Sequence, residues 1–157
     1  MRKLQIAVYQ FKELSKEAKR KALEYFSGIN VDHDWWADTY RDARDIGLEI
    51  TKYEERICKG HLLCESLESI KKVLANHGTK CETYQTALRY QKEITDEIKM
   101  SGNVDTLLEL DEEYVLALLE DYRIMLNKEY EYLTSEEAII ETIEANDYEF
   151  TEEGKLV

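Results

Sequence analysis

The chain has 157 residues, 43% of them apolar and 35% charged, and its formal net charge is −13. This apolar content supplies a core and excludes global disorder. No stretch reaches the roughly 18–20 apolar residues of a membrane span, the N-terminus lacks the apolar core of a signal peptide, and an odd count of three cysteines argues against a disulfide framework. We therefore expect a cytoplasmic protein.

The first hundred residues predict an α+β body. Alternation of Leu4, Ile6 and Val8 with polar or small residues predicts an N-terminal strand. Ser15 is a suitable N-cap for the helix that follows, and Gly47 is a suitable left-handed terminator for the next one. The elements expected here are helices over about 16–27, from about 33 to 46, 65–76 and 82–100, with an extended region near 48–63.

The segment Ser101-Gly102-Asn103 is the clearest hinge, and three elements are expected after it. These are a long helix over about 105–133, a shorter helix over about 135–145 and a terminal hairpin over 148–157. The long helix carries one apolar stripe made of Leu108, Val115, Leu118, Leu119, Tyr122, Met125, Leu126 and Leu133. The fold class is thus mostly helical α+β with a small antiparallel sheet. We expect a single domain over 1–157, with 1–100 and 103–157 as candidate sub-units.

The net charge lies entirely in the last third of the sequence. Residues 1–100 carry 18 Lys+Arg and 17 Asp+Glu, whereas residues 101–157 carry 3 and 17. Glu109, Glu113, Glu120 and Glu131 share the helix face opposite the apolar stripe. This face is either an ordinary solvated surface or a surface that binds a basic partner protein. Direct nucleic-acid binding is not expected, because it needs clustered Lys and Arg.

The most distinctive stretch of the body is acidic and aromatic. Asp34 and Asp38 begin a carboxylate row that continues to Asp42 and Asp45, and Trp35 borders it. Such a row could hold Mg²⁺ or Ca²⁺, but neighbouring arginines make a charge-paired surface the preferred interpretation. Trp35 is either an exposed anchor for a partner or a half-buried packing residue.

Two further sets of side chains are candidates for catalysis or metal binding. Glu129 falls inside the apolar stripe, so we expect it to be partly buried and satisfied by a hydrogen-bond donor more readily than to be catalytic. All cysteines and two histidines lie within 24 residues, which suffices by number for zinc. Their spacing is not that of a standard knuckle, so ordinary cysteines are preferred and no metal or cofactor is expected. The five residues are Cys58, His61, Cys64, His77 and Cys81.

Several phrases together resemble a family of small acidic proteins of phages, prophages and other bacterial mobile elements. They are Phe11–Lys19, Asp34–Trp36, Tyr40–Ala43, Cys58–Gly60, Asn76–Gly78, Cys81–Tyr84, Glu129–Ala138 and Tyr148–Lys155, which cover the chain nearly end to end. His61 and Cys64 depart from the pattern. Some members carry an antitoxin-like label, and the resemblance implies a mobile-element setting inside a bacterial host cell. In that setting small acidic proteins block host nucleases by binding their basic channels.

The expected function is therefore a non-enzymatic inhibitor, either anti-defence (for example anti-CRISPR-like) or an antitoxin. It would bind a basic, nucleic-acid-handling host protein through the acidic helix face, with Asp34, Trp35 and Asp38 as further contacts. The alternative is a nucleotide- or metal-binding protein or enzyme that uses Asp34-Trp35-Trp36 together with Glu129. A virion or assembly component is a third hypothesis.

Overall fold

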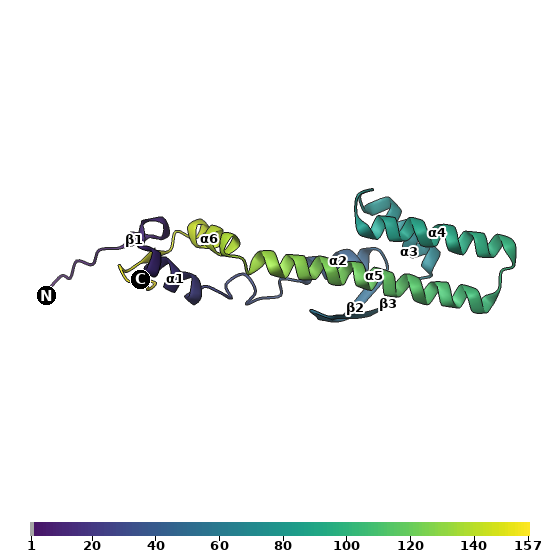
Figure 1. The fold of residues 1–157 in the computed structure, drawn as a ribbon, viewed down its shortest axis with the longest axis horizontal. Coiled ribbons are helices and arrows are strands. Elements are labelled where there is room, and N and C mark those ends of the chain that lie inside the picture. Colours follow the sequence, from purple (N-terminus) through teal and green to yellow (C-terminus); the bar gives the residue numbers. More distant parts are fainter. Residues whose placement is uncertain (1) are drawn as a thin grey trace. The chain divides into compact units, whose positions relative to one another are not determined.

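A computed structural model describes residues 2–157 and confirms the mostly helical α+β class (Figure 1). In this part of the chain there are six α-helices, one short 3-10 helix, and four strands that pair as two antiparallel couples. None of the helices found in residues 2–157 combines the length and apolar character needed to cross a bilayer.

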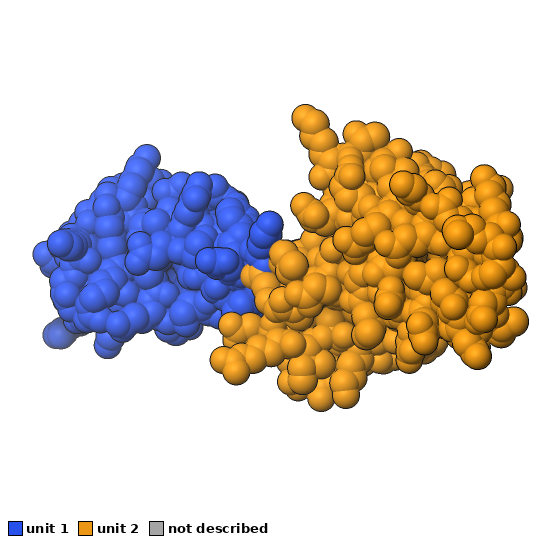
Figure 2. Space-filling model, turned by 45° about the vertical axis from the view of Figure 1, so that its right-hand side comes forward, with its two compact units in different colours: residues 1–35, 128–157 blue, residues 36–127 orange. Residues whose placement is uncertain are grey.

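The chain divides into two compact units (Figure 2). The segment up to Trp35 and Lys128–Val157 form one unit, which we call the terminal unit. Trp36–Asn127 forms the other, which we call the central unit. The hinge expected at 101–103 is the loop between two helices inside the central unit. The two compact units therefore differ from the candidate sub-units 1–100 and 103–157.

The central unit packs helices against one face of a β-hairpin. Its elements are α2 (Ala37–Asp45), β2 (Leu48–Glu54), β3 (Ile57–Leu62), α3 (Ser66–Asn76), α4 (Glu82–Met100) and most of α5 (Val104–Leu133). Gly47 adopts φ +85°, which confirms the left-handed terminator after α2. Gly60 of β3 passes close to the partner strand and to α5, because a Cβ there would lie 2.2 Å from the carbonyl oxygen of Glu49 and 3.1 Å from Leu119. Only glycine allows that approach.

Helices α4 and α5 run antiparallel and pack through their apolar stripes. Tyr90 on α4 meets Tyr114 on α5 with ring centroids 5.8 Å apart, and Tyr114 is fully buried. The predicted stripe missed Tyr114 and was wrong at Leu108 and Met125, which are exposed. A stripe is buried only where another element covers it, and the sequence pattern does not give that limit. Glu129 is half-buried, as its position in the stripe predicted.

The terminal unit packs a helix pair against a small sheet. Its elements are β1 (Tyr9–Gln10), the 3-10 helix η1 (Phe11–Glu13), α1 (Lys16–Tyr25), the end of α5, α6 (Glu136–Ala145) and β4 (Glu149–Phe150). Phe150 is fully buried and forms an antiparallel bridge with Leu156, which confirms the terminal hairpin. Gly154 in its turn has φ +89°, and a Cβ there would lie 2.3 Å from the carbonyl oxygen of Ala18.

The N-terminal strand prediction was wrong in position. Leu4, Ile6 and Val8 are exposed by 90%, 70% and 42%, and the strand is the pair Tyr9–Gln10. β4 offers only two residues to pair with, and the chain turns directly after it. The single predicted sheet is also two separate sheets, because β1 pairs with β4 and β2 pairs with β3.

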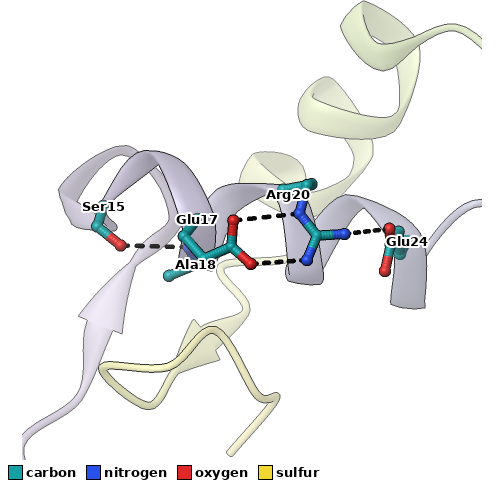
Figure 3. Close-up of polar contacts among 5 residues, drawn as sticks. All are labelled: Ser15, Glu17, Ala18, Arg20 and Glu24. Carbon is teal, nitrogen blue, oxygen red and sulfur yellow. Dashed lines mark hydrogen bonds and ion pairs between the residues drawn. The ribbon is translucent and has the colours of Figure 1, made fainter.

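In helix α1 both carboxylates are paired with one arginine (Figure 3). The Ser15 hydroxyl accepts a hydrogen bond from the Ala18 amide at 3.2 Å, which confirms the predicted N-cap. Arg20 donates to Glu17 at 2.7 and 3.2 Å and also to Glu24. This helix provides a comparison for the surface described next.

Candidate protein-interaction surface

The end of the α4–α5 hairpin, residues 91–113, is the candidate site, and we call it the acidic tip. Figure 1 shows its loop at the far end of the central unit, beyond α2, α3 and the β-hairpin. Glu97 organises the loop, because its carboxylate accepts hydrogen bonds from Ser101 Oγ at 2.5 Å and from the Asn103 amide at 3.3 Å. Asn103 in turn accepts from the Thr106 amide at 3.1 Å and so caps α5. Gly102 supplies the positive φ of +60° that the loop needs.

Carboxylates dominate the acidic tip. It carries eight Asp+Glu and two Lys, a net charge of −6, in 23 residues. In the described part of the chain none of these carboxylates has an ion-pair partner, in contrast to Glu17 and Glu24 of α1. The carboxylates are Glu93, Asp96, Glu97, Asp105, Glu109, Asp111, Glu112 and Glu113. They leave a negative field that the protein itself does not cancel.

The two units share the net negative charge almost equally, whereas along the sequence all of it lies after residue 100. The central unit has 12 Lys+Arg and 19 Asp+Glu, and the terminal unit has 9 and 15, so their net charges are −7 and −6. The acidic residues after position 127 fold together with the basic residues near the N-terminus. Within the central unit, the acidic tip carries all but one of the net negative charges.

The four glutamates predicted to share one face have three different environments. Glu109 and Glu113 are exposed on the acidic tip. Glu120 is ion-paired with Arg123 at 2.6 Å, and this pairing lowers the pKa of Glu120 through the hydrogen bond from the guanidinium. Glu131 is exposed in the terminal unit. The structure therefore brings only Glu109 and Glu113 of this set into one uncompensated cluster.

The other predicted contact residues are separated. Asp34 and Trp35 precede α2 and belong to the terminal unit, where Trp35 is half-buried with its ring 5.5 Å from that of Tyr130. Asp38 is exposed on α2 in the central unit and pairs with Arg41 at 3.3 Å. The carboxylate row therefore does not extend to Asp34, which lies outside the helix.

Asp42, whose side chain is half exposed, accepts from a partly buried polar network that the sequence did not reveal. Tyr122 donates a hydrogen bond to Asp42 Oδ2 at 2.8 Å, and His77 Nε2 lies 3.2 Å from the same oxygen without hydrogen-bond geometry. His77 Nδ1 contacts Thr83 Oγ1 at 2.6 Å. Burial, with the adjacent Asp42 carboxylate, raises the pKa of Tyr122 far above its usual range, so the hydroxyl remains a donor.

This network has the connectivity of a hydroxyl–imidazole–carboxylate triad but not its accessibility. The side chain that would be the nucleophile, Thr83, is only 2% exposed, and a reacting hydroxyl must reach substrate. The network instead joins α2, the end of α3, α4 and α5 through polar contacts. Its role is to hold these elements together.

The residues considered for zinc do not converge. Within residues 2–157, no three His, Cys, Asp or Glu side chains are grouped closely enough to hold a metal ion. Cys58 is half-buried, and burial raises the pKa of its thiol to about 11, which disfavours the thiolate that zinc requires. The Cys64 sulfur lies against Gly47, and His77 belongs to the Asp42 network.

Sequence reasoning missed the contribution of α4 to the acidic surface. Glu93 and Asp96 are exposed near the end of α4. In the sequence they belong to residues 1–100, whose charges nearly balance, so they did not stand out. The hinge at 101–103 was the useful signal, because two amphipathic helices joined by a short loop pack antiparallel. Adding the charges on both sides of the 101–103 loop would have identified the acidic tip from the sequence.

The chain matches no protein-family model, and comparisons with curated proteins and with solved structures likewise find no match. The acidic tip is therefore the feature from which a function can be inferred.

Proposed function

We propose that this protein is a non-enzymatic inhibitor or antitoxin that binds a basic, nucleic-acid-handling host protein through the acidic tip. The observation that carries the proposal is the concentration of eight carboxylates and two lysines in residues 91–113, without internal ion pairs in the described chain. The mobile-element setting comes from the family resemblance alone. Binding would block the partner's nucleic-acid surface.

The charge density of the acidic tip supports mimicry of a polyanion. Each helix contributes ten residues to the tip, so it is about 15 Å long. The net charge of −6 over that length corresponds to about one charge per 2.5 Å, compared with about one per 1.7 Å for duplex DNA. One helix face alone would fall well short of this density. The antiparallel pairing of α4 and α5 brings the tip close to it.

Such a surface acts mainly on association. Uncompensated charge of one sign raises the association rate with a basic partner and selects against acidic ones. Because exposed charges are screened over about 8–10 Å at physiological salt, binding is expected to weaken as salt rises. The loop hydrogen bonds to Glu97 limit the mobility of the hairpin end, so the charges are held in a fixed arrangement.

The alternative of a nucleotide or metal site at Asp34-Trp35-Trp36 has less support. Trp35 packs on Tyr130, and Trp36 packs on Tyr40 with ring centroids 6.4 Å apart. Two cavities of about 370 and 900 Å³ lie in the terminal unit, and neither is lined by these residues.

Affinity capture with matched variants tests the proposal. Wild-type protein and the Glu109→Lys/Glu113→Lys variant are immobilised and exposed to host lysate, and retained proteins are identified by mass spectrometry. Glu152→Lys/Glu153→Lys, which changes net charge equally in an exposed turn of the terminal unit, is the control.

We expect wild type and control to retain a basic nucleic-acid-binding protein that duplex DNA displaces, and the tip variant to lose it. A partner that all three retain equally, or that duplex DNA does not displace, would contradict the proposal.

A further inference from the structure

Helix α5 exposes a row of large apolar side chains beside the carboxylates. Val104, Leu108, Leu116 and Ile124 are exposed by 68%, 59%, 64% and 38%. They occur at multiples of four residues, so they lie on one i±4n ridge of the helix surface, in which Glu112 and Glu120 occupy the two intervening positions. The ridge extends over about 30 Å at 1.5 Å per residue, and it winds around the helix because four residues exceed one turn. The leucines and the valine of this ridge are exposed, so packing in the core of the central unit does not account for their apolar character.

A parallel ridge of carboxylates lies next to the apolar one. Asp105, Glu109 and Glu113 also repeat every four residues. Each comes one position after a residue of the first ridge, namely Val104, Leu108 and Glu112. Rows offset by one residue lie side by side around a helix, with a groove between them. At the hairpin end, Ile98 and Met100 of α4 add exposed apolar surface, at 51% and 83%.

We infer that the groove between these two ridges binds an amphipathic α-helix of the partner, with an apolar row that contacts Val104, Leu108 and Leu116 and a Lys/Arg row that contacts Asp105, Glu109 and Glu113. This inference rests on the proposed function, since it names the element by which the basic partner is recognised. The two ridges share a four-residue repeat and the same inclination to the helix axis, and the ridges of a partner helix have that repeat too. Ridges-into-grooves packing of such rows is the commonest helix–helix arrangement.

Charge complementarity selects the occupant. A second copy of this chain would place one acidic ridge against another, and like charges in register are unfavourable. A neutral amphipathic helix would cover the apolar row but leave the carboxylates facing apolar or uncharged groups. A cationic amphipathic helix satisfies both rows.

Two synthetic 20-residue peptides of identical composition test the inference. The first has Leu at every fourth position and Lys one residue after each Leu, and the second has these residues permuted so that neither row forms. Binding to the 157-residue protein is measured by fluorescence anisotropy at 150 mM salt. Protein variants are Leu108→Ser/Leu116→Ser, which keeps the net charge, and Leu63→Ser/Leu67→Ser, a control at exposed leucines elsewhere in the central unit.

We expect the patterned peptide to bind at least tenfold more tightly than the permuted peptide, and the Leu108/Leu116 variant to lose at least tenfold while the control loses less than twofold. Equal binding of both peptides, no binding of either, or no effect of Leu108 and Leu116 would overturn the helix inference. The capture experiment with the Glu109→Lys/Glu113→Lys variant tests the proposed function independently of the peptides. A failure of the helix inference can therefore be distinguished from a failure of the proposed function.

Discussion

Replacing Tyr122 with Phe removes the donor of the 2.8 Å hydrogen bond to Asp42 and changes no other heavy atom. Hydrogen bonds to charged groups contribute about 1.5–3 kcal/mol. The Asp42 side chain is 51% exposed, so water can replace the lost donor in part, and the expected loss is about 1–2 kcal/mol. For a unit of this size that corresponds to a fall of roughly 5–15 °C in the unfolding midpoint.

Calorimetry on the Tyr122→Phe protein measures this loss, and Tyr84→Phe is the control, since its half-buried ring has no hydrogen bond in the described chain. A double-mutant cycle with Asp42→Ala, which removes the acceptor, isolates the pair. Tyr122→Phe should destabilise markedly more in the wild-type background than in the Asp42→Ala background. A midpoint within 1–2 °C of that of Tyr84→Phe, or identical losses in both backgrounds, would refute the assignment of this network as a structural tie.

Two further stability predictions follow from individual residues. Burial raises the pKa of Asp121, partly offset by the 2.6 Å hydrogen bond from Thr86, so ionisation of Asp121 destabilises the fold above that pKa. Asp121→Asn should raise the thermal midpoint at pH 7, and this advantage should shrink as pH falls through the raised pKa and be gone at about pH 3.8; a less stable variant at pH 7 contradicts this. Gly154→Ala should cost at least about 2 kcal/mol in denaturant unfolding, because it forces positive φ on a side chain that meets the Ala18 carbonyl. Gly28→Ala, with no atom within 4 Å of the new Cβ, should be close to neutral; similar losses in both variants would refute the reasoning.

Except for α2, which begins at Ala37 and not near residue 33, the helices were predictable from the sequence because their boundary signals are local. Ser15 caps α1 as expected, and its hydroxyl accepts from the Ala18 amide at 3.2 Å. Ser135 caps α6 in the same way. The start and end of α5 were within one residue of the expected limits. Periodicity and caps are properties of neighbouring residues, so no knowledge of the rest of the chain was needed.

The strands and the acidic surface depended on contacts distant in sequence. Alternation at Leu4 and Ile6 is a valid strand pattern, but β4 pairs with Tyr9 and Gln10 instead. Similarly, charge counted along the chain separated Glu93 from Glu109, which the α4–α5 hairpin places in one tip. Pairing partners are set by tertiary packing, which a pattern read along one segment does not contain.

Recognition of a basic partner by the acidic tip can be measured by titration calorimetry. The captured partner is titrated against wild type, Glu109→Lys/Glu113→Lys and Glu152→Lys/Glu153→Lys at two salt concentrations. We predict that the tip variant binds at least tenfold more weakly, that the control stays within threefold of wild type, and that the difference narrows at high salt. Equal dissociation constants for the two variants would contradict the account.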